Sequence, residues 1–148
     1  DIAEKGTSGS TLADLKGEQP WNDEKKLFEE FKDSIYVKHL YGPLFFGFTS
    51  HFLNLFKNID EKIKVLIIRM DRVPHIDQTG LYAMEETLFD LNKKGLLVVI
   101  VGLQSQPEDM LRSIDIIPDL IPEKQLFENM DIGLSWLKKE LNKDMTTH

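Results

Sequence analysis

The sequence predicts an α/β fold, with one domain built on a mixed, largely parallel sheet that is flanked by about four helices. Two observations carry this prediction. The apolar runs 65–68 and 96–101 are typical of strands buried on both faces, because they lack alternation with polar residues. Stretches with apolar residues at helical spacing lie between and after these runs. The resulting element order is β-β-α-β-α-β-α-(β)-α, which favours parallel strands joined by helices.

The composition is that of an ordinary globular domain and excludes several kinds of chemistry. Hydrophobic residues make up 41% and charged residues 29% of the 148 residues, which argues against a wholly disordered chain. The formal net charge of −7 opposes contact with phosphate backbones, so nucleic acid is not an expected partner. The chain has no cysteine, which excludes disulfides, thiolate metal sites and cysteine nucleophiles. No apolar run approaches the roughly 20 residues that span a bilayer, so we do not expect this chain to insert into a membrane.

Residues 1–33 differ from the rest and predict a polar linker or leader. The segment Gly6–Ser10 has the composition of a flexible linker. Apolar side chains near the end of the leader favour a short helix within 22–32. Because the first residue is Asp1 rather than methionine, we expect the chain to be a fragment of a longer protein.

The globular domain is expected over residues 34–142, followed by a disordered tail at 143–148. Ile35–Tyr41 is rich in β-branched and aromatic residues and predicts a strand. Gly42-Pro43 then signals a turn before the short apolar strand Leu44–Phe46, so an antiparallel hairpin is the simplest interpretation. A helix with one buried stripe follows, and its apolar residues are Phe48, Phe52, Leu55 and Phe56.

The helix between the two buried strands has the most complete signature. Lys93 and Lys94 stand in its last turn, where cations stabilise the negative end of the helix dipole. Gly95 follows at the position of a left-handed C-cap. The apolar residues that define the buried face of this helix are Leu81, Met84, Leu88 and Leu91.

Three further elements complete the predicted order. Ser105 and Glu108 have the spacing of a capping box, which predicts a helix with Ser105 as its N-cap and Pro107 in its first turn. Leu126-Phe127 predicts an edge strand. A C-terminal amphipathic helix is predicted last, with the apolar residues Met130, Leu134, Leu137 and Leu141.

The first candidate site lies in segment 71–81, where a buried strand ends and the best-defined helix begins. Strand ends and helix N-termini converge at this edge of an α/β sheet, and binding sites are common there. Asp77 is suited to cap the helix by accepting hydrogen bonds from the amides of Thr79 or Gly80. Thr79 is then expected in the first turn, with its hydroxyl near solvent and beside the positive end of the helix dipole.

Thr79 allows two interpretations. A phosphate on its hydroxyl would be stabilised by free amides and by the dipole, and would change the surface charge by about −2 for whatever docks there. Alternatively, the segment is only a helix cap and a close-packed turn. His75 and Asp77 could project to one side, but no third ligand lies near them in sequence, so no metal site is predicted.

A second candidate corner is Gly47-Phe48-Thr49-Ser50, at the start of the preceding helix. Unpaired amides at a helix start form a weak anion site, to which Thr49 and Ser50 would add hydroxyl donors. Helix capping alone explains both residues equally well. The glycine-rich phosphate loops of nucleotide enzymes are absent from the sequence, and no nucleophile–base pair is visible, so no enzyme is predicted.

The ordered set of motifs resembles the STAS domain, a family named after sulfate transporters and anti-sigma factor antagonists. The resemblance runs from about Ile35 to Leu141 and rests on Gly42-Pro43-Leu44-Phe45-Phe46-Gly47, Val73-Pro74-His75-Ile76-Asp77-Gln78-Thr79-Gly80-Leu81, Gly95 and Gly102-Leu103-Gln104. Stand-alone antagonists carry Asp-Ser-Ser-Gly, whose second serine is phosphorylated by a partner kinase. The resemblance places Thr79 at that position, with Gln78 in place of the first serine, and makes His75, Asp77, Gln78 and Gly80 the switch loop and cap.

Two branches of this family imply different functions. The motif Gly42-Pro43-Leu44-Phe45-Phe46-Gly47 resembles the cytoplasmic C-terminal domain of SulP-type anion permeases. That branch implies a non-catalytic regulatory domain at the cytoplasmic face of the cell membrane. Its expected partners are the transmembrane domain of the same permease and a cytosolic regulatory protein. The alternative is a stand-alone anti-sigma factor antagonist, working by reversible phosphorylation of Thr79 in a partner-switching cascade.

No cofactor is expected, except for a nucleotide, which the resemblance leaves open. Members of this family have been linked to nucleotide binding, and the two helix N-termini are the places where this chain could hold a phosphate.

Overall fold

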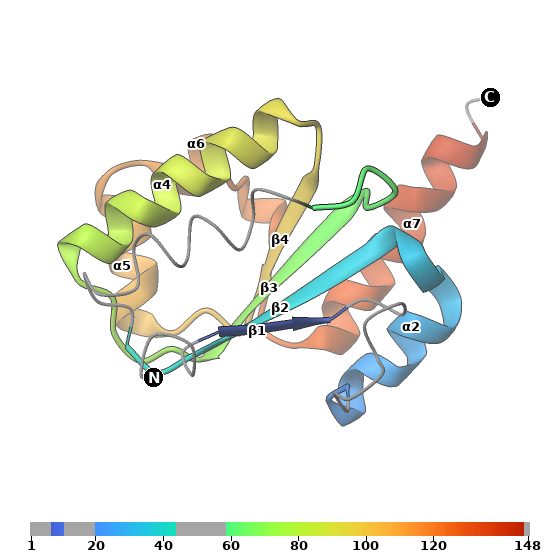
Figure 1. Ribbon diagram of the computed structural model, residues 1–148, viewed down its shortest axis with the longest axis horizontal. Helices are drawn as coiled ribbons and strands as arrows, with labels where there is room; N and C mark the ends of the chain where they lie inside the picture. The colour runs from blue at the N-terminus through green and yellow to red at the C-terminus, as the bar shows by residue number, and fades with distance from the viewer. Residues whose placement is uncertain (1–6, 11–19, 44–58, 147–148) are drawn as a thin grey trace.

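The computed structural model describes residues 7–10, 20–43 and 59–146, and its centre is a five-stranded sheet (Figure 1). The strands follow the order β1-β2-β3-β4-β5 across the sheet. Four strands, β2 to β5, run parallel, and β1 is antiparallel to β2. Their bounds are β1 (Thr7–Ser10), β2 (Ile35–Tyr41), β3 (Val65–Arg72), β4 (Leu97–Val101) and β5 (Leu126–Phe127).

Helices cover both faces of the sheet in the described part of the chain. The groups α4 to α6 and α2 with α7 lie on opposite sides of it (Figure 1). The helices longer than one turn are α2 (Lys25–Phe31), α4 (Gln78–Lys93), α5 (Ser105–Ser113) and α7 (Met130–Thr146). The shorter ones are η1 (Asn22–Glu24), η2 (Lys32–Ser34), α6 (Ile116–Asp119) and η4 (Glu123–Gln125). The predicted mixed, largely parallel α/β fold is thereby confirmed.

Strand β3 shows why the apolar runs do not alternate with polar residues. Leu66 and Ile68 lie in the core beneath α4, whereas Val65 and Ile67 lie in the core beneath α2 and α7. All four side chains are fully buried. Successive side chains of a strand point to opposite faces, so a strand covered on both faces needs apolar residues at every position.

Helix α4 has the boundaries that its sequence predicts. Its apolar residues are buried against the sheet, and Gly95 follows the helix with φ of +80°. The N–H groups of Gly95 and Leu96 donate to the carbonyl oxygens of Asn92 and Leu91, at 3.0 and 3.2 Å. The left-handed glycine therefore ends α4 by satisfying carbonyl groups of its last turn.

The prediction of a flexible linker at Gly6–Ser10 is wrong for residues 7–10. They form β1, which pairs with β2 in the register Thr7 to Leu40 through Ser10 to Val37. This small, polar segment has no apolar alternation, and the pairing needs only backbone donors and acceptors along an open strand edge. The predicted helix within 22–32 is confirmed as η1 and α2, whose Leu27 and Phe28 are buried in the core beside α7.

Two predictions near the ends of helices are also wrong. Gln104, rather than Ser105, takes the N-cap position of α5, and the capping box does not form. The Glu108 carboxylate instead accepts a hydrogen bond from Nε of Arg112 at 2.9 Å, and a charged donor one turn away outcompetes a neutral amide. The expected tail at 143–148 begins too early, because α7 continues to Thr146.

The predicted strand at 44–46 and the helix carrying Phe48, Phe52, Leu55 and Phe56 lie outside the described residues. In the described part, the antiparallel neighbour of β2 is β1. The remaining predicted elements, β5 and the C-terminal helix that begins at Met130, are confirmed. No helix within 7–10, 20–43 and 59–146 is long and apolar enough to cross a membrane.

Candidate functional site

The first candidate site is the corner where β3 passes into α4, at the carboxyl edge of the parallel strands. The loop is held from α5 by Gln106, whose side-chain amide bonds both backbone groups of Ile76. Its Oε1 accepts from the N–H of Ile76 at 2.9 Å, and its Nε2 donates to the carbonyl of Ile76 at 3.0 Å. The side chain of Ile76 is fully buried. The start of α4 is therefore fixed by packing and by a second helix.

Asp77 caps α4 as predicted. Its backbone is extended (φ −90°, ψ 174°), and its Oδ1 accepts a hydrogen bond from the N–H of Gly80 at 2.8 Å. Its carbonyl accepts the N–H of Leu81 at 2.8 Å, which is the first bond of the helix. The amides of Thr79 and Gly80 were the two predicted donors, and the carboxylate of Asp77 accepts its hydrogen bond from that of Gly80, as expected for an N-cap residue.

Replacing Asp77 with alanine is expected to lower the free energy of unfolding by about 1 kcal/mol, because the N–H of Gly80 loses its acceptor. Urea unfolding followed by circular dichroism measures the loss. Gln78→Ala is the matched control, since Gln78 is exposed and, within the described residues, its amide donates only to the hydroxyl of Tyr82, at 3.0 Å. The control should shift the free energy by less than about 0.5 kcal/mol. Equal losses in both variants would show that the cap does not stabilise α4.

The other predicted site residues lie around this cap. Thr79 is half-buried in the first turn of α4, so part of its surface reaches solvent. Gly80 is buried, whereas His75 and Gln78 are exposed. The structure thus brings together the predicted residues of segment 75–80 at one corner.

The second candidate corner, Gly47-Phe48-Thr49-Ser50, lies outside the described residues. Within the described ranges, no group of three or more histidine, cysteine, aspartate or glutamate side chains could hold a metal ion. The carboxylate of Asp77 is already occupied by the N–H of Gly80.

A buried polar cluster, which was not predicted, joins the N-terminal segment to the sheet. Glu24 is fully buried, and its Oε2 lies 2.7 Å from Nε2 of His39 and 3.1 Å from Nη1 of Arg69. Its Oε1 accepts a hydrogen bond from the N–H of Trp21 at 3.2 Å. Because a carboxylate only accepts, Nε2 of His39 donates to Glu24. Both oxygens of this buried carboxylate therefore have partners.

Arg69 is the centre of this cluster and is only 3% exposed. Its Nε and Nη2 donate to the two oxygens of Asp71 at 3.0 and 2.9 Å, and its Nη1 donates to Asp23 at 2.6 Å. Burial by itself lowers the pKa of Arg69, but the hydrogen bonds and charges of Asp71 and Asp23 outweigh burial and raise the pKa above its ordinary value. The guanidinium group therefore remains charged.

Trp21 covers the cluster from the outside. The Cζ atoms of Arg69 and Arg72 both lie 4.4 Å from the centre of its ring, a distance at which cations are attracted to an aromatic face. The ring of His39 stacks on Trp21 with a centroid distance of 4.6 Å. These contacts attach residues 20–24 to β2 and β3, so this part of the predicted leader belongs to the domain.

A signal for this cluster was present in the sequence. His39 and Arg69 interrupt strands that are otherwise apolar, and they are partners in the parallel register of β2 and β3. Buried charges are normally paired, so two such residues at adjacent positions require carboxylates nearby. The sequence does not show that the carboxylates come from Asp23 and Glu24, because the contacts span 45 and 46 residues.

The mixed, largely parallel sheet with helices on both faces is a fold that this chain shares with a solved STAS domain. The family model described as STAS domain matches residues 29–131, and the chain belongs to this family.

Two curated relatives are named as transporters. The chain is 32% identical over 79 residues to "Putative sulfate transporter YvdB" of Bacillus subtilis, a match that covers 53% of this chain and 15% of that protein. It is 24% identical over 112 residues to "Bicarbonate transporter BicA" of Synechocystis, covering 76% of this chain and 20% of that protein. These matches thus span a fifth or less of each transporter.

Solved structures agree with the family. A sulfate transporter family protein from Wolinella succinogenes is 29% identical, with a TM-score of 0.66 over 74% of this chain and 88% of that one. The SulP transporter STAS domain from Vibrio cholerae is 25% identical, with a TM-score of 0.64 over 81% and 96%. The murine anion transporter Slc26a9 shares the fold, at 16% identity and a TM-score of 0.68 over 93% of this chain and 24% of that one. The similarity is therefore to STAS domains associated with transporters.

Proposed function

We propose that this chain is a non-catalytic regulatory and protein-interaction domain of a SulP-type transporter of sulfate or a related anion, at the cytoplasmic face of the cell membrane. The observation that carries the proposal is that two curated transporters match this chain over only 15% and 20% of their own length. A STAS domain that accounts for so small a share of its relatives acts together with the rest of such a protein. Its first partner is the transmembrane domain of that same transporter.

The experiment is to read the open reading frame that contains this chain. We expect it to extend upstream of the codon for Asp1 and to encode many apolar segments of about 20 residues, each long enough to span a bilayer. A start codon a few residues before Asp1, followed by no such segments, would contradict the proposal.

Within this function, the corner at the start of α4 is the proposed control site. Asp77 and Gln106 fix the backbone there, so a phosphate or a carboxylate at Thr79 would change the charge of the corner without melting the helix. A cytosolic protein that reads this corner is the second proposed partner.

The alternative function uses the same corner in a different setting. Partial exposure of Thr79 in the first turn of α4 also suits a stand-alone antagonist of an anti-sigma factor, which a kinase would switch. A short reading frame, together with phosphorylation of Thr79 by a kinase encoded beside it, would favour this alternative over the transporter domain.

A further inference from the structure

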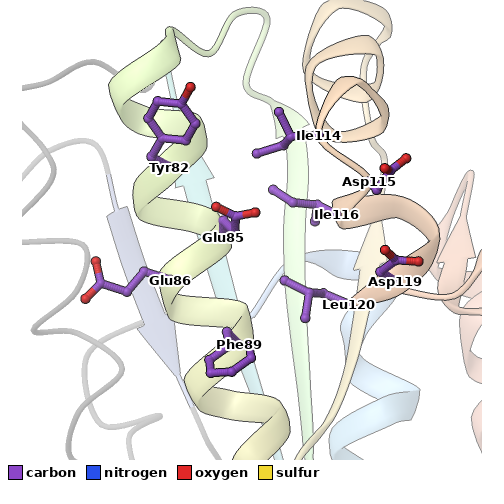
Figure 2. Close-up of a pocket in the computed structure, with 9 residues that line it drawn as sticks. All are labelled: Tyr82, Glu85, Glu86, Phe89, Ile114, Asp115, Ile116, Asp119 and Leu120. Carbon is purple, nitrogen blue, oxygen red and sulfur yellow. The ribbon is translucent and has the colours of Figure 1, made fainter.

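An open groove runs between α4 and the turn of α6 (Figure 2). Both elements lie on the face of the sheet opposite α2 and α7 (Figure 1). It encloses about 560 Å³. Tyr82 and Phe89 mark its extent along α4, which is about 10 Å at a rise of about 1.5 Å per residue. The apolar residues on its opposite side are Ile114, Ile116 and Leu120.

Large aromatic side chains are exposed at this groove. Tyr82 is 48% exposed and Phe89 is 50% exposed, and they are two of the three large hydrophobic residues that the described part of the chain leaves open to solvent. Single exposed apolar residues are common, but two that line one groove with three further apolar side chains are typical of an interaction surface.

The charged side chains that line the groove are all acidic. The groove is lined by Glu85 and Glu86 from α4 and by Asp115 and Asp119 from the opposite side (Figure 2). None of these four carboxylates forms an ion pair or a side-chain hydrogen bond with a residue in the described ranges. A cation lies at one end of the groove, where Nζ of Lys93 is 4.6 Å from the centre of the Phe89 ring.

Asp115 follows the end of α5, where its N–H donates to the carbonyl of Arg112 at 3.1 Å. Its backbone has φ of +63° and ψ of 22°, and it is the only residue other than glycine with a positive φ in the described part of the chain. Its side chain forms no cap to α6, and in Figure 2 its carboxylate lies on the side of the turn that faces away from α4.

From these features we infer that the groove binds a cationic amphipathic helix of a partner protein. Such a helix presents apolar side chains on one face, and these pack against the aromatic and aliphatic side chains of the groove. Lysine or arginine residues beside them pair with the four carboxylates. Charge complementarity excludes the other simple occupants. A second copy would place four carboxylates against four others, and an anionic membrane surface would be repelled by the same groups. Binding at this groove depends on the residues that line it and does not require Thr79 to be a control site.

The probe is a fluorescein-labelled peptide of about 14 residues, composed of leucine and lysine with leucine at helical spacing, since shorter helices are marginal in water. Its binding to the 148-residue chain is measured by fluorescence anisotropy. We expect saturable binding that weakens about tenfold in Glu85→Gln/Asp119→Asn and about tenfold in Phe89→Ala. A peptide with glutamate in place of lysine should not bind.

Matched controls separate the groove from the overall charge of the chain. The variant Glu29→Gln/Glu61→Gln removes the same two charges from exposed positions outside the groove and should change the affinity by less than about twofold. Equal weakening by both double variants, or no effect of Phe89→Ala, would overturn the inference. Tighter binding of the chain to anionic lipid vesicles than to the peptide, or self-association through the groove, would overturn it as well.

Discussion

Replacing Arg69 with methionine is expected to lower the free energy of unfolding by about 3–5 kcal/mol, because it leaves the buried carboxylate of Glu24 without its cation. Methionine retains most of the apolar stem but cannot donate hydrogen bonds. Glu24, which is fully buried, would keep only His39 and the N–H of Trp21 as partners. The free energy of unfolding in urea at neutral pH measures this loss.

Arg112→Met is the matched control for this prediction. Arg112 also donates to two carboxylates, with bonds of 2.9 Å to Glu108 and of 2.6 and 2.9 Å to Glu123. Its side chain is 39% exposed, however, so water replaces the lost bonds, and the expected loss is much smaller than that of Arg69→Met. If both variants lost the same small amount, the Arg69 cluster would not be part of what stabilises the domain.

Gly102→Ala is expected to be the second most damaging single change, at about 3 kcal/mol. Gly102 has φ of +75°, a left-handed conformation that costs an alanine roughly 1–2 kcal/mol. A Cβ atom there would also lie 2.4 Å from Cγ of Asp71. Relieving that clash moves Asp71 away from Arg69, from which it accepts two hydrogen bonds. The substitution therefore both strains the backbone at residue 102 and weakens the Arg69 cluster.

Gly95→Ala isolates the backbone contribution to this loss. Gly95 has φ of +80°, but a Cβ atom there meets nothing within 4 Å. Its replacement should therefore cost only the roughly 1–2 kcal/mol of the left-handed conformation. Thermal and urea unfolding of both variants give the comparison. Equal losses at the two glycines would show that Asp71 does not closely contact Gly102.

Local patterns predicted the elements whose determinants lie close together in sequence. The buried strands β3 and β4 appear as apolar runs, and α4 carries its N-cap at Asp77, its apolar stripe and the left-handed Gly95 that ends it within 19 residues. Because cap, stripe and end signal agree for this helix, the position of Thr79 in its first turn could also be predicted.

Features that depend on distant partners could not be predicted in this way. Asp23 and Glu24 appear in the sequence as ordinary charges of a polar segment, and only the fold brings them to Arg69. The same holds for Gln106, which lies between Ser105 and Glu108 of the predicted capping box but holds the loop at Ile76, 30 residues away. Strand β1 was not predicted, because its pairing with β2 uses backbone groups, which leave no pattern in the sequence.

The central claim is that charge at the start of α4 controls anion transport, and one measurement tests it most directly. It is the initial rate of anion uptake, with sulfate and with bicarbonate, in cells that produce the full-length protein. We expect Thr79→Glu to change the rate by at least about twofold at equal protein level, because the added charge alters docking at that corner. Ser135→Glu adds the same charge to an exposed position of α7 and should leave the rate unchanged. An uptake rate that Thr79→Glu leaves equal to that of the wild type, for both anions, would contradict the claim.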